Sequence, residues 1–483
     1  MSRSFLFLFI FISFLIIITT GLFSCANIIP PSGGPRDSLP PVLIKATPND
    51  SSVHFNTNKI TLNFDEYVTI DNPQDNIIVW PNPVKQPTIE SKLRTVTIKL
   101  RDSLEKNTTY TILFGKGLKD VNEGNADTSF NYVFTTGSKL DKNVIRGKVI
   151  LAETGKIDTT LLVVLQTNLS DTAIKKIAPR YYARLNRGGN FRFFNLPADT
   201  FNIFVVPNDY TKRYDDSTKM FAYLNKPLYV KDTSTAPVTL YAFEEYKPKD
   251  KSITANTSKN VTTNSSKASA KRKRNKDSTL KVTADFENGK QDFLKPLTLT
   301  FSDTLQSFDT GKIHLTDTLY QQMNGLHFSQ DSTLTKLIIN YKWKENTIYK
   351  LIIEKDAASD SLGKTITKND TLSFSTLRES DYGSLRINFQ NVDTSKHPVL
   401  LLLQNEKIVE SAPITSYQWY QKYIRPGEYE MRVLFDTNRN GKWDAGSYEK
   451  KTQPEVVESV KTISRANKIN LRGNWDNEEN VSL

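Results

Sequence analysis

The clearest candidate for a chemical site is a polar stretch near the C-terminus, residues 436–446. Side chains that carry oxygen recur there at every second position, and Gly441 permits a sharp turn among them. Oxygen atoms presented in this way can converge on one hard cation, and calcium is such a cation. The stretch therefore predicts a calcium site whose ligands are the side chains of Asp436, Asn438, Asn440 and Asp444 and the carbonyl of Lys442.

The spacing resembles that of an EF-hand calcium loop but departs from it in two ways. Position twelve of the loop is Ser447 rather than a bidentate glutamate, and Glu449 would reach the ion only by folding back. Two of the three leading ligands are also neutral asparagines. The alternative is a polar turn in which Asn and Asp side chains accept hydrogen bonds from backbone amides. Both interpretations stay open, and no cofactor other than this calcium is expected.

The rest of the chain carries few residues typical of enzymes or metalloproteins. One cysteine and four histidines in 483 residues are too few for a zinc finger, an iron-sulfur cluster or a disulfide framework. The sequence also lacks the HExxH, GxSxG and phosphate-loop motifs. We therefore predict that the protein is not an enzyme.

The single cysteine, Cys25, follows an apolar run from Phe5 to Ile18 that is typical of a secretory signal peptide. A single transmembrane anchor is the alternative, because the stretch from Phe5 to Phe23 would almost span a bilayer. The three residues before the cysteine favour a different outcome. Leu22, Phe23 and Ser24, followed by Cys25, resemble the lipobox of bacterial lipoproteins. The resemblance implies cleavage before Cys25, diacylation of its thiol and acylation of the new amino terminus.

Several acyl chains on one residue give stable attachment to a membrane, whereas one chain alone is marginal. We therefore expect a mature protein that is tethered to the membrane by its N-terminal lipid and does not span it. No acidic cluster follows Cys25, so the periplasmic face of the outer membrane is the expected location. The sequence does not identify the envelope protein or glycan that the protein would bind.

Positive charge is concentrated in one segment. The net charge is +12, and residues 247–277 alone contain ten Lys and Arg against two Asp. The remainder is close to balanced, so no basic groove for nucleic acid is indicated. The segment has almost no apolar side chains, which predicts a flexible linker. Electrostatic contact of this segment with anionic lipid or polysaccharide is the alternative.

A long-period duplication organises the rest of the chain. Matching blocks recur at a nearly constant distance, which chance does not explain, and they define two kinds of unit in the order A-B-A-B. Pairs of corresponding residues lie 237 to 239 residues apart: Phe64 and Phe301, Tyr110 and Tyr349, and Gln166 and Gln404.

Both A units alternate apolar and polar residues, as at Ile60, Leu62 and Phe64, which is typical of half-buried strands. About seven such strands in roughly 100 residues indicate a β-sandwich. The first A unit resembles the S-layer type of bacterial Ig-like domain, and the second does so less strongly because it lacks the double proline. The motifs that carry the resemblance are Pro40-Pro41, Ile60-Thr-Leu-Asn-Phe64-Asp-Glu, Tyr110-Thr-Ile and Phe134-Thr-Thr-Gly137.

The B units begin near Ile145 and Gly383 and resemble the carboxypeptidase-regulatory or transthyretin-like β-sandwich. A turn followed by a strand that begins with an aromatic residue carries this resemblance. The turn is Pro426-Gly427 before Tyr429 in the second copy, whereas the first copy has Ala198 in place of the glycine. Neither family is catalytic, and the resemblance specifies no ligand.

Together these patterns predict an all-β protein, a tandem array of four antiparallel β-sandwich domains of Ig-like and transthyretin-like type in A-B-A-B order. The expected segments are a signal peptide (1–24), a lipid-anchored tether (25–39), an Ig-like domain (40–137), a transthyretin-like sandwich (143–243), a basic linker (247–277), a second Ig-like domain (278–377) and a second transthyretin-like sandwich (383–473).

We expect this array to act as a non-catalytic structural, adhesion or protein-interaction scaffold of the cell envelope. The alternative is a glycan-binding lipoprotein of a polysaccharide-uptake system, in which exposed aromatic rings stack on sugars. The candidate rings are Trp80, Trp343, Trp419, Trp443 and Trp475, and core packing is the expected role for most of them.

Overall fold

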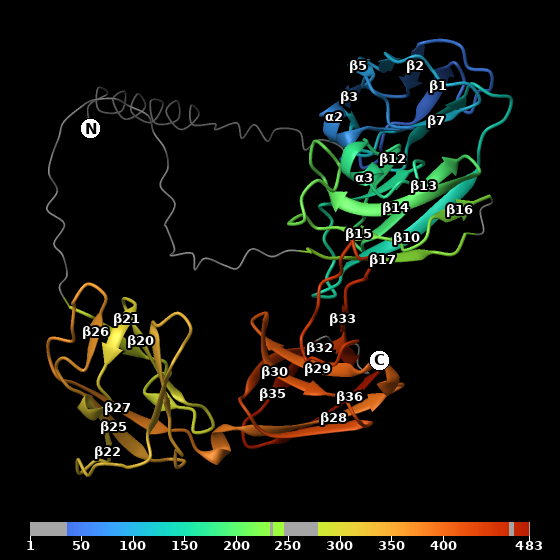
Figure 1. Cartoon of the computed structure of the whole chain (residues 1–483). Coiled ribbons are helices and arrows are strands. Elements are labelled where there is room, and N and C mark those ends of the chain that lie inside the picture. Colours follow the sequence, from blue (N-terminus) through green and yellow to red (C-terminus); the bar gives the residue numbers. More distant parts are fainter. Residues whose placement is uncertain (1–35, 232–234, 246–278, 463–467, 483) are drawn as a thin grey trace, which may run out of the picture.

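The structure is a computed structural model that describes residues 36–231, 235–245, 279–462 and 468–482. Its strands form ten sheets, and these group into four units that follow one another along the chain (Figure 1). We call the units A1 (36–137), B1 (143–245), A2 (279–377) and B2 (383–482). The all-β fold class and the repeated order of units predicted from the sequence are confirmed.

Unit A1 packs a four-stranded sheet, in the order β1-β2-β6-β5, against the three-stranded sheet β4-β7-β9, with β3-β8 as a separate pair. Along β2, Ile60, Leu62 and Phe64 are buried and the residues between them are not, which is the predicted alternation. The elements are β1 (Leu43–Thr47), β2 (Lys59–Phe64), β3 (Val68–Ile70), α2 (Pro73–Asn76), β4 (Ile78–Trp80), β5 (Thr88–Lys92), β6 (Thr95–Lys99), β7 (Thr109–Leu113), β8 (Leu118–Asp120) and β9 (Asn131–Thr135).

Unit A2 repeats this arrangement and adds one short strand, β19, beside β27. Its sheets are β18-β20-β24-β23, β19-β27-β25-β22 and the pair β21-β26. The elements are β18 (Val282–Ala284), β19 (Lys290–Gln291), β20 (Leu297–Phe301), β21 (Leu305–Phe308), η1 (Thr310–Lys312), β22 (Ile313–Thr316), β23 (His327–Gln330), β24 (Lys336–Asn340), β25 (Ile348–Ile353), β26 (Ala358–Asp360) and β27 (Asp370–Thr376), followed by the 3₁₀ turn η2 (Glu379–Asp381) before B2.

Unit B1 consists of the sheet β13-β10-β17 and the sheet β12-β11-β14-β15, with β16 also pairing β14. All six residues of β11 are buried, because both faces of this central strand are covered. The elements are β10 (Asn143–Leu151), β11 (Leu161–Gln166), α3 (Ala173–Lys176), β12 (Tyr181–Arg184), β13 (Asn190–Leu196), β14 (Asp199–Pro207), β15 (Ala222–Tyr223), β16 (Leu228–Val230) and β17 (Val238–Ala242).

Unit B2 repeats B1, with the sheets β31-β28-β36-β34 and β30-β29-β32-β33 and with β35 pairing β32. Its last strand, β36, lies beyond residue 473, where the sequence analysis ends this unit. The elements are β28 (Gly383–Gln390), η3 (Thr394–Lys396), β29 (Pro398–Gln404), β30 (Lys407–Pro413), β31 (Gln418–Ile424), β32 (Gly427–Phe435), β33 (Val456–Ser459), β34 (Lys461–Thr462), β35 (Lys468–Leu471) and β36 (Asp476–Ser482).

The duplication also holds in strand register. Tyr110 lies opposite Phe134 in the β7–β9 pair, and Tyr349 lies opposite Phe374 in the β25–β27 pair. Each tyrosine hydroxyl accepts a hydrogen bond from the backbone amide five residues earlier, at 2.8 Å in A1 and 3.2 Å in A2. The residues used to detect the repeat therefore occupy equivalent positions in two copies of one fold.

A1 and B1 meet in a buried joint. Trp80 of β4 is 3% exposed and packs on Phe193 of β13, with ring centroids 5.4 Å apart. The indole N–H of Trp80 donates to the Tyr182 carbonyl at 2.8 Å. At the rim of the joint, Arg180 donates to both carboxylate oxygens of Glu105, at 2.8 and 2.5 Å. The joint thus combines apolar burial, a buried hydrogen bond and a bidentate ion pair.

A2 and B2 meet in a similar joint. The Tyr382 hydroxyl donates to the carboxylate of Asp292 at 2.5 Å. The Phe293 ring packs edge-on against Tyr382 at 5.2 Å, and Arg425 pairs with Glu287 at 3.3 Å. Both A–B pairs are therefore fixed by directional contacts between the two sandwiches.

The spatial order of the units differs from their order in the sequence. Figure 1 shows A1 (blue), B1 (green) and B2 (red) one below another, with A2 (yellow) beside B2. Strand β33 of B2 extends up to the edge of B1 near β15 and β17 (Figure 1). The second half of the chain therefore folds back so that the two B units touch.

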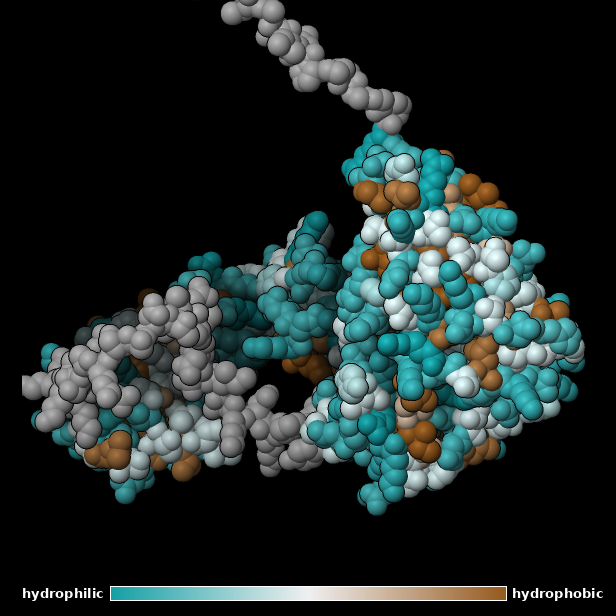
Figure 2. Space-filling model, turned by 90° about the horizontal axis from the view of Figure 1, so that it is seen from above, coloured by the Kyte–Doolittle hydropathy of each residue, from teal (hydrophilic) through white to brown (hydrophobic). Residues whose placement is uncertain are grey.

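The face seen in Figure 2 is mostly polar, and its apolar residues form small separate patches. Scattered apolar residues of this kind are ordinary on protein surfaces. Within the described part of the chain, no helix has both the length and the apolar character needed to cross a bilayer.

Candidate functional site

The predicted calcium loop follows β32 of B2, and the structure brings its five predicted residues together. Arg439 and Gly441 have positive φ values of 61° and 74°, which curl the chain back on itself. Asp436 is 3% exposed, and its carboxylate accepts the amides of Asn440 at 3.2 Å and Gly441 at 2.7 Å. A buried carboxylate at the base of the loop therefore fixes its curvature.

The two asparagines stabilise the same turn. The side-chain oxygen of Asn438 accepts the amide of Asn440 at 3.0 Å, and that of Asn440 accepts the amide of Lys442 at 2.8 Å. Both side-chain amides donate to one oxygen of Asp444, at 2.6 Å each. These are the bonds expected of the polar turn weighed as the alternative in the sequence analysis.

Glu455 is a member of this site that the sequence analysis missed. It lies 11 residues after Asp444, yet its carboxylate accepts the amides of Thr437 at 2.7 Å and Asp444 at 3.1 Å. Burial raises the pKa of Glu455, and the neighbouring Asp436 carboxylate adds to the effect, although the backbone amides that it accepts act in the opposite direction. The Pro454-Glu455 sequence before β33 carries no motif that reveals this contact in advance.

Three carboxylates thus accept hydrogen bonds within one short loop, and they belong to Asp436, Asp444 and Glu455. Among the residues that the structure describes, no group of three or more acidic, histidine or cysteine side chains is arranged to hold a metal ion. The side chains of Asp436, Asn438, Asn440 and Asp444, which were predicted as calcium ligands, instead accept hydrogen bonds from amides. Calcium binding stays a prediction, and it requires the amide groups of Asn438 and Asn440 to turn away from Asp444.

In the equivalent loop of B1, a lysine ammonium lies between two carboxylates. Lys219 places its ammonium 2.5 Å from Asp209 and 2.6 Å from Asp215. Burial acts to raise the pKa of Asp209, but the contact with Lys219 and the hydrogen bonds from Thr211 and Lys212 outweigh this effect and lower the pKa. A lysine of the chain therefore supplies the positive charge between carboxylates in B1.

The residues of the predicted lipid-attachment motif, Leu22, Phe23, Ser24 and Cys25, lie outside the described residues. The same holds for the whole of the basic segment 247–277. Lipidation and the properties of that segment stay predictions from the sequence.

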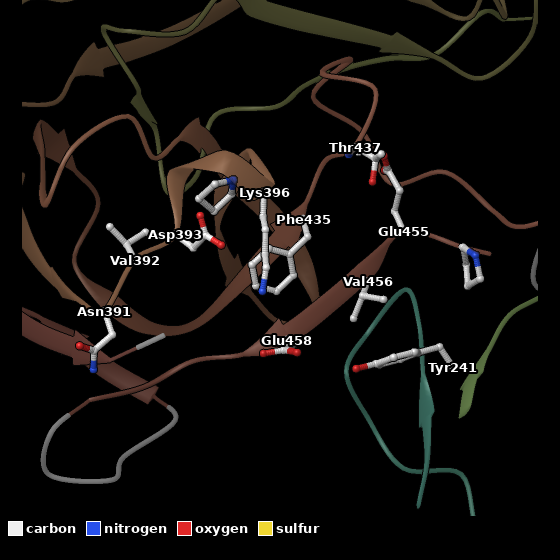
Figure 3. A pocket seen from close by; sticks show the side chains of 12 residues that line it. Tyr241, Asn391, Val392, Asp393, Lys396, Phe435, Thr437, Glu455, Val456 and Glu458 are labelled. Carbon is white, nitrogen blue, oxygen red and sulfur yellow. Dashed lines mark hydrogen bonds between the residues drawn. The ribbon is translucent and has the colours of Figure 1, made fainter. Parts of the chain in front are cut away.

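A cavity of about 380 Å³ lies where B1 and B2 meet, next to the loop. Figure 3 shows Tyr241 of B1 reaching across to Val456 and Glu458 of B2. On the other side of the cavity, the Lys396 ammonium lies 5.8 Å from the centre of the Phe435 ring. The cavity is therefore lined by both halves of the chain, and its walls carry charges of both signs.

The candidate sugar-stacking rings differ in exposure. Trp80 and Trp343 are 3% and 6% exposed and pack in cores, and Trp419 and Trp443 are partly buried. Trp475 is 59% exposed, and the Arg472 guanidinium lies over its ring at 5.0 Å. Of the five predicted rings, Trp475 alone is open enough for a sugar to stack on it.

Comparison with known families identifies the first unit. The family described as a bacterial Ig-like domain matches residues 37–136, which correspond to A1. This match confirms the Ig-like part of the resemblance for A1. A search of curated proteins gives no match.

The solved structures with some similarity share little sequence with this chain. The Bacillus anthracis TIE protein is 9% identical, with 94% of this chain and 76% of that chain covered and a TM-score of 0.16. BcpA, the major pilin subunit of Bacillus cereus, is 8% identical, with coverage of 70% and 99% and a TM-score of 0.17. The S-layer protein rSbsC(31-844) is 11% identical, with coverage of 83% and 53% and a TM-score of 0.15. Similarity at this level carries no argument about the function of this chain.

Proposed function

We propose that the protein is a cell-envelope lipoprotein that serves as a non-catalytic structural, adhesion or protein-interaction scaffold. The observation that carries this proposal is the way in which the sandwiches are joined. Trp80 is buried between A1 and B1, and Tyr382 bonds to Asp292 between A2 and B2. Joints of this kind suit a rigid body that holds surfaces at fixed positions. The bacterial Ig-like family match of A1 also supports the proposal.

The proposal includes a lipid anchor at Cys25 in the outer membrane, with the folded units on the periplasmic side. A Cys25→Ala variant tests it, because the thiol is the proposed acceptor of the diacylglycerol. We expect radiolabelled fatty acid to appear in the wild type and in an Asn27→Ala control, and to be absent from Cys25→Ala. Label that persists in Cys25→Ala would refute the anchor.

The scaffold role itself is tested by its partners. Affinity capture from membranes with the lipid intact, followed by identification of co-purifying proteins, should return envelope components in stoichiometric amounts. Turnover of an envelope polymer by the purified protein would contradict a non-catalytic role.

Glycan binding is the second candidate, and the exposed ring of Trp475 favours it. Tyr420 on strand β31 of the same sheet is 48% exposed and lies beside Arg386, so the same unit offers a second ring. Stacking of a sugar on an exposed ring is lost when the ring is removed. Binding on a glycan array that disappears in Trp475→Ala but survives in Tyr210→Ala, which removes a fully exposed ring of B1, would support this role.

A further inference from the structure

Unit B1 carries a cluster of buried aromatic rings next to the edge strand β15. Phe204, Tyr214, Phe221 and Tyr223 are each at most 3% exposed. Tyr214 stacks on Phe221 with ring centroids 3.9 Å apart, and Phe221 in turn stacks on Phe204 at 5.8 Å. We call these four residues the B1 aromatic cluster. A segment of B2 contributes to covering it.

That segment comprises residues 444–457, which connect the asparagine-rich loop to β33. Within it, Ser447 and Thr452 exchange two backbone hydrogen bonds, at 2.8 and 3.0 Å, and so close a small hairpin. Tyr448 lies at the start of the hairpin tip and points into B1. Its ring meets all four rings of the B1 aromatic cluster edge-on, with centroid distances of 5.0 to 6.3 Å. Edge-to-face contacts of this kind stabilise beyond simple burial.

Tyr448 contributes to the core of B1 rather than to that of B2. It is 5% exposed and belongs to the hydrophobic cluster formed by B1, whereas the core of B2 is built from strands β28 to β36 without it. A large aromatic side chain of one sandwich thus completes the packing of another. The burial of Tyr448 is lost whenever the two units separate.

Hydrogen bonds match the polar atoms of the segment to B1. The hydroxyl of Tyr223 donates to the carbonyls of Ser447 and Thr452, at 3.1 and 2.9 Å. The hydroxyl of Tyr448 donates to the Asp171 carbonyl at 3.1 Å, and its backbone amide donates to Glu245. The buried polar groups of the hairpin therefore find partners in B1, which buried polar groups need.

Complementary charges and close backbone contacts surround the rings. Lys451 pairs with Asp171 at 2.7 Å. The Val457 amide donates to the Ala152 carbonyl at 2.7 Å, and this approach leaves no room for a side chain at Gly155, where a Cβ would lie 2.8 Å from the Val457 carbonyl oxygen. The two backbones therefore fit each other closely, as they do in specific interfaces.

We infer that residues 444–457 of B2 form a ligand that the B1 aromatic cluster binds, so that the two halves of the chain associate independently of the covalent connection between them. The partner for this surface of B1 is thus a segment of the same chain. An aromatic anchor in a desolvated pocket, ringed by hydrogen bonds and one ion pair, is the arrangement that dominates binding energy in protein interfaces.

The test uses the full chain with a recognition sequence for a site-specific protease inserted within residues 246–278. After folding and cleavage, we expect residues 36–245 and 279–483 to co-elute as a one-to-one complex at low micromolar concentration. Halves that separate on gel filtration after cleavage would overturn the inference.

Variants then assign the association to the segment. Tyr448→Ala should weaken the association of the cleaved halves by at least about a hundredfold, because a fully packed ring is removed. Tyr420→Ala, which removes an exposed ring of B2, should leave the association unchanged. Equal affinity of Tyr448→Ala and the wild type would overturn the inference, provided that far-ultraviolet circular dichroism shows both halves to be folded.

Two milder changes keep the test valid if Tyr448→Ala fails to fold. Tyr223→Phe keeps the ring and removes the hydroxyl that bonds to two carbonyls of the hairpin, so the association should weaken about fivefold to tenfold. Lys451→Glu should weaken it a few-fold, and combination with Asp171→Lys should restore part of the loss. Two results together would overturn the inference: full affinity in Tyr223→Phe, and failure of Asp171→Lys to restore the affinity lost in Lys451→Glu.

Discussion

Replacement of Trp80 by alanine should uncouple A1 from B1. The side chain belongs to β4 of A1, but it is 3% exposed because B1 covers it, and its N–H bonds to Tyr182 at 2.8 Å. Loss of a buried tryptophan costs about 3–5 kcal/mol, and the Tyr182 carbonyl left without its donor adds to this cost. At roughly 2–4 °C per kcal/mol for a pair of this size, the melting midpoint should fall by about 6–20 °C.

Differential scanning calorimetry of the full chain measures this effect. In the wild type, A1 and B1 should unfold in one cooperative transition, and in Trp80→Ala this transition should move down and split in two. Trp343→Ala is the matched control, because Trp343 is also buried and its N–H donates to Lys295 at 3.1 Å, but within A2. It should lower the stability of A2 and leave the A1–B1 transition in place. An unsplit A1–B1 transition at the wild-type temperature in Trp80→Ala would show that the joint does not couple the units.

Three further results are expected. Asp436→Ala leaves the Gly441 amide without an acceptor and the Asn440 amide with Asn438 alone, and should cost about 1–3 kcal/mol in calcium-free buffer; an Asp393→Ala control should cost less. If the loop binds calcium, wild-type melting should rise in calcium relative to chelator and Asp436→Ala melting should not, whereas calcium-independent melting of the wild type would end the calcium hypothesis. The hydrogen bond from Arg180 lowers the pKa of Glu105, so the pair stabilises the A1–B1 joint at pH values above the ordinary glutamate pKa, and this stability is lost as the pH falls through the lowered value. In Glu105→Gln, the stability of the A1–B1 pair should therefore depend less on pH between about pH 6 and about pH 3. The difference in unfolding free energy should be under about 1 kcal/mol, because both side chains are partly exposed.

Much of the fold could be predicted from the sequence because period-two alternation depends on local residue order. Ile60, Leu62 and Phe64 alternate with half-buried residues in β2, and the equivalent Leu297, Leu299 and Phe301 do the same in β20. The constant spacing of the repeated blocks predicted the order of the units, but it gave no information about the contacts between them. Strand β36 was harder, because its sequence Asp476–Ser482 has one buried residue and pairs in parallel with β28 far away in the chain.

The loop site and the contact between B1 and B2 were only partly predictable, since Glu455 and Tyr448 contact residues to which no local sequence pattern connects them. The turn from Asp436 to Asp444 follows from the spacing of Asn, Asp and Gly. Glu455 reaches it only because β33 returns beside β32, and that pairing depends on tertiary structure. Tyr448 lies in a segment whose sequence reads as an ordinary polar connection, and its packing partner is a unit more than 200 residues away in the sequence.

The difference between the two B units explains why the duplicated halves meet at one place. After β14, the B1 loop turns onto its own sandwich, where the Tyr214 amide bonds to Ile174 at 3.2 Å and Lys219 neutralises two aspartates. After β32, hydrogen bonds to the carboxylates of Asp436 and Glu455 fix the conformation of the B2 loop. The segment that follows this loop places Tyr448 against B1. Because B1 offers an aromatic surface and B2 offers an extended loop, the contact joins unlike partners made from equivalent parts of the repeat. A duplication that kept both copies identical would not provide this complementarity, so the divergence of this loop contributes to the folded-back arrangement, together with contacts such as the ion pair of Lys156 with Glu406.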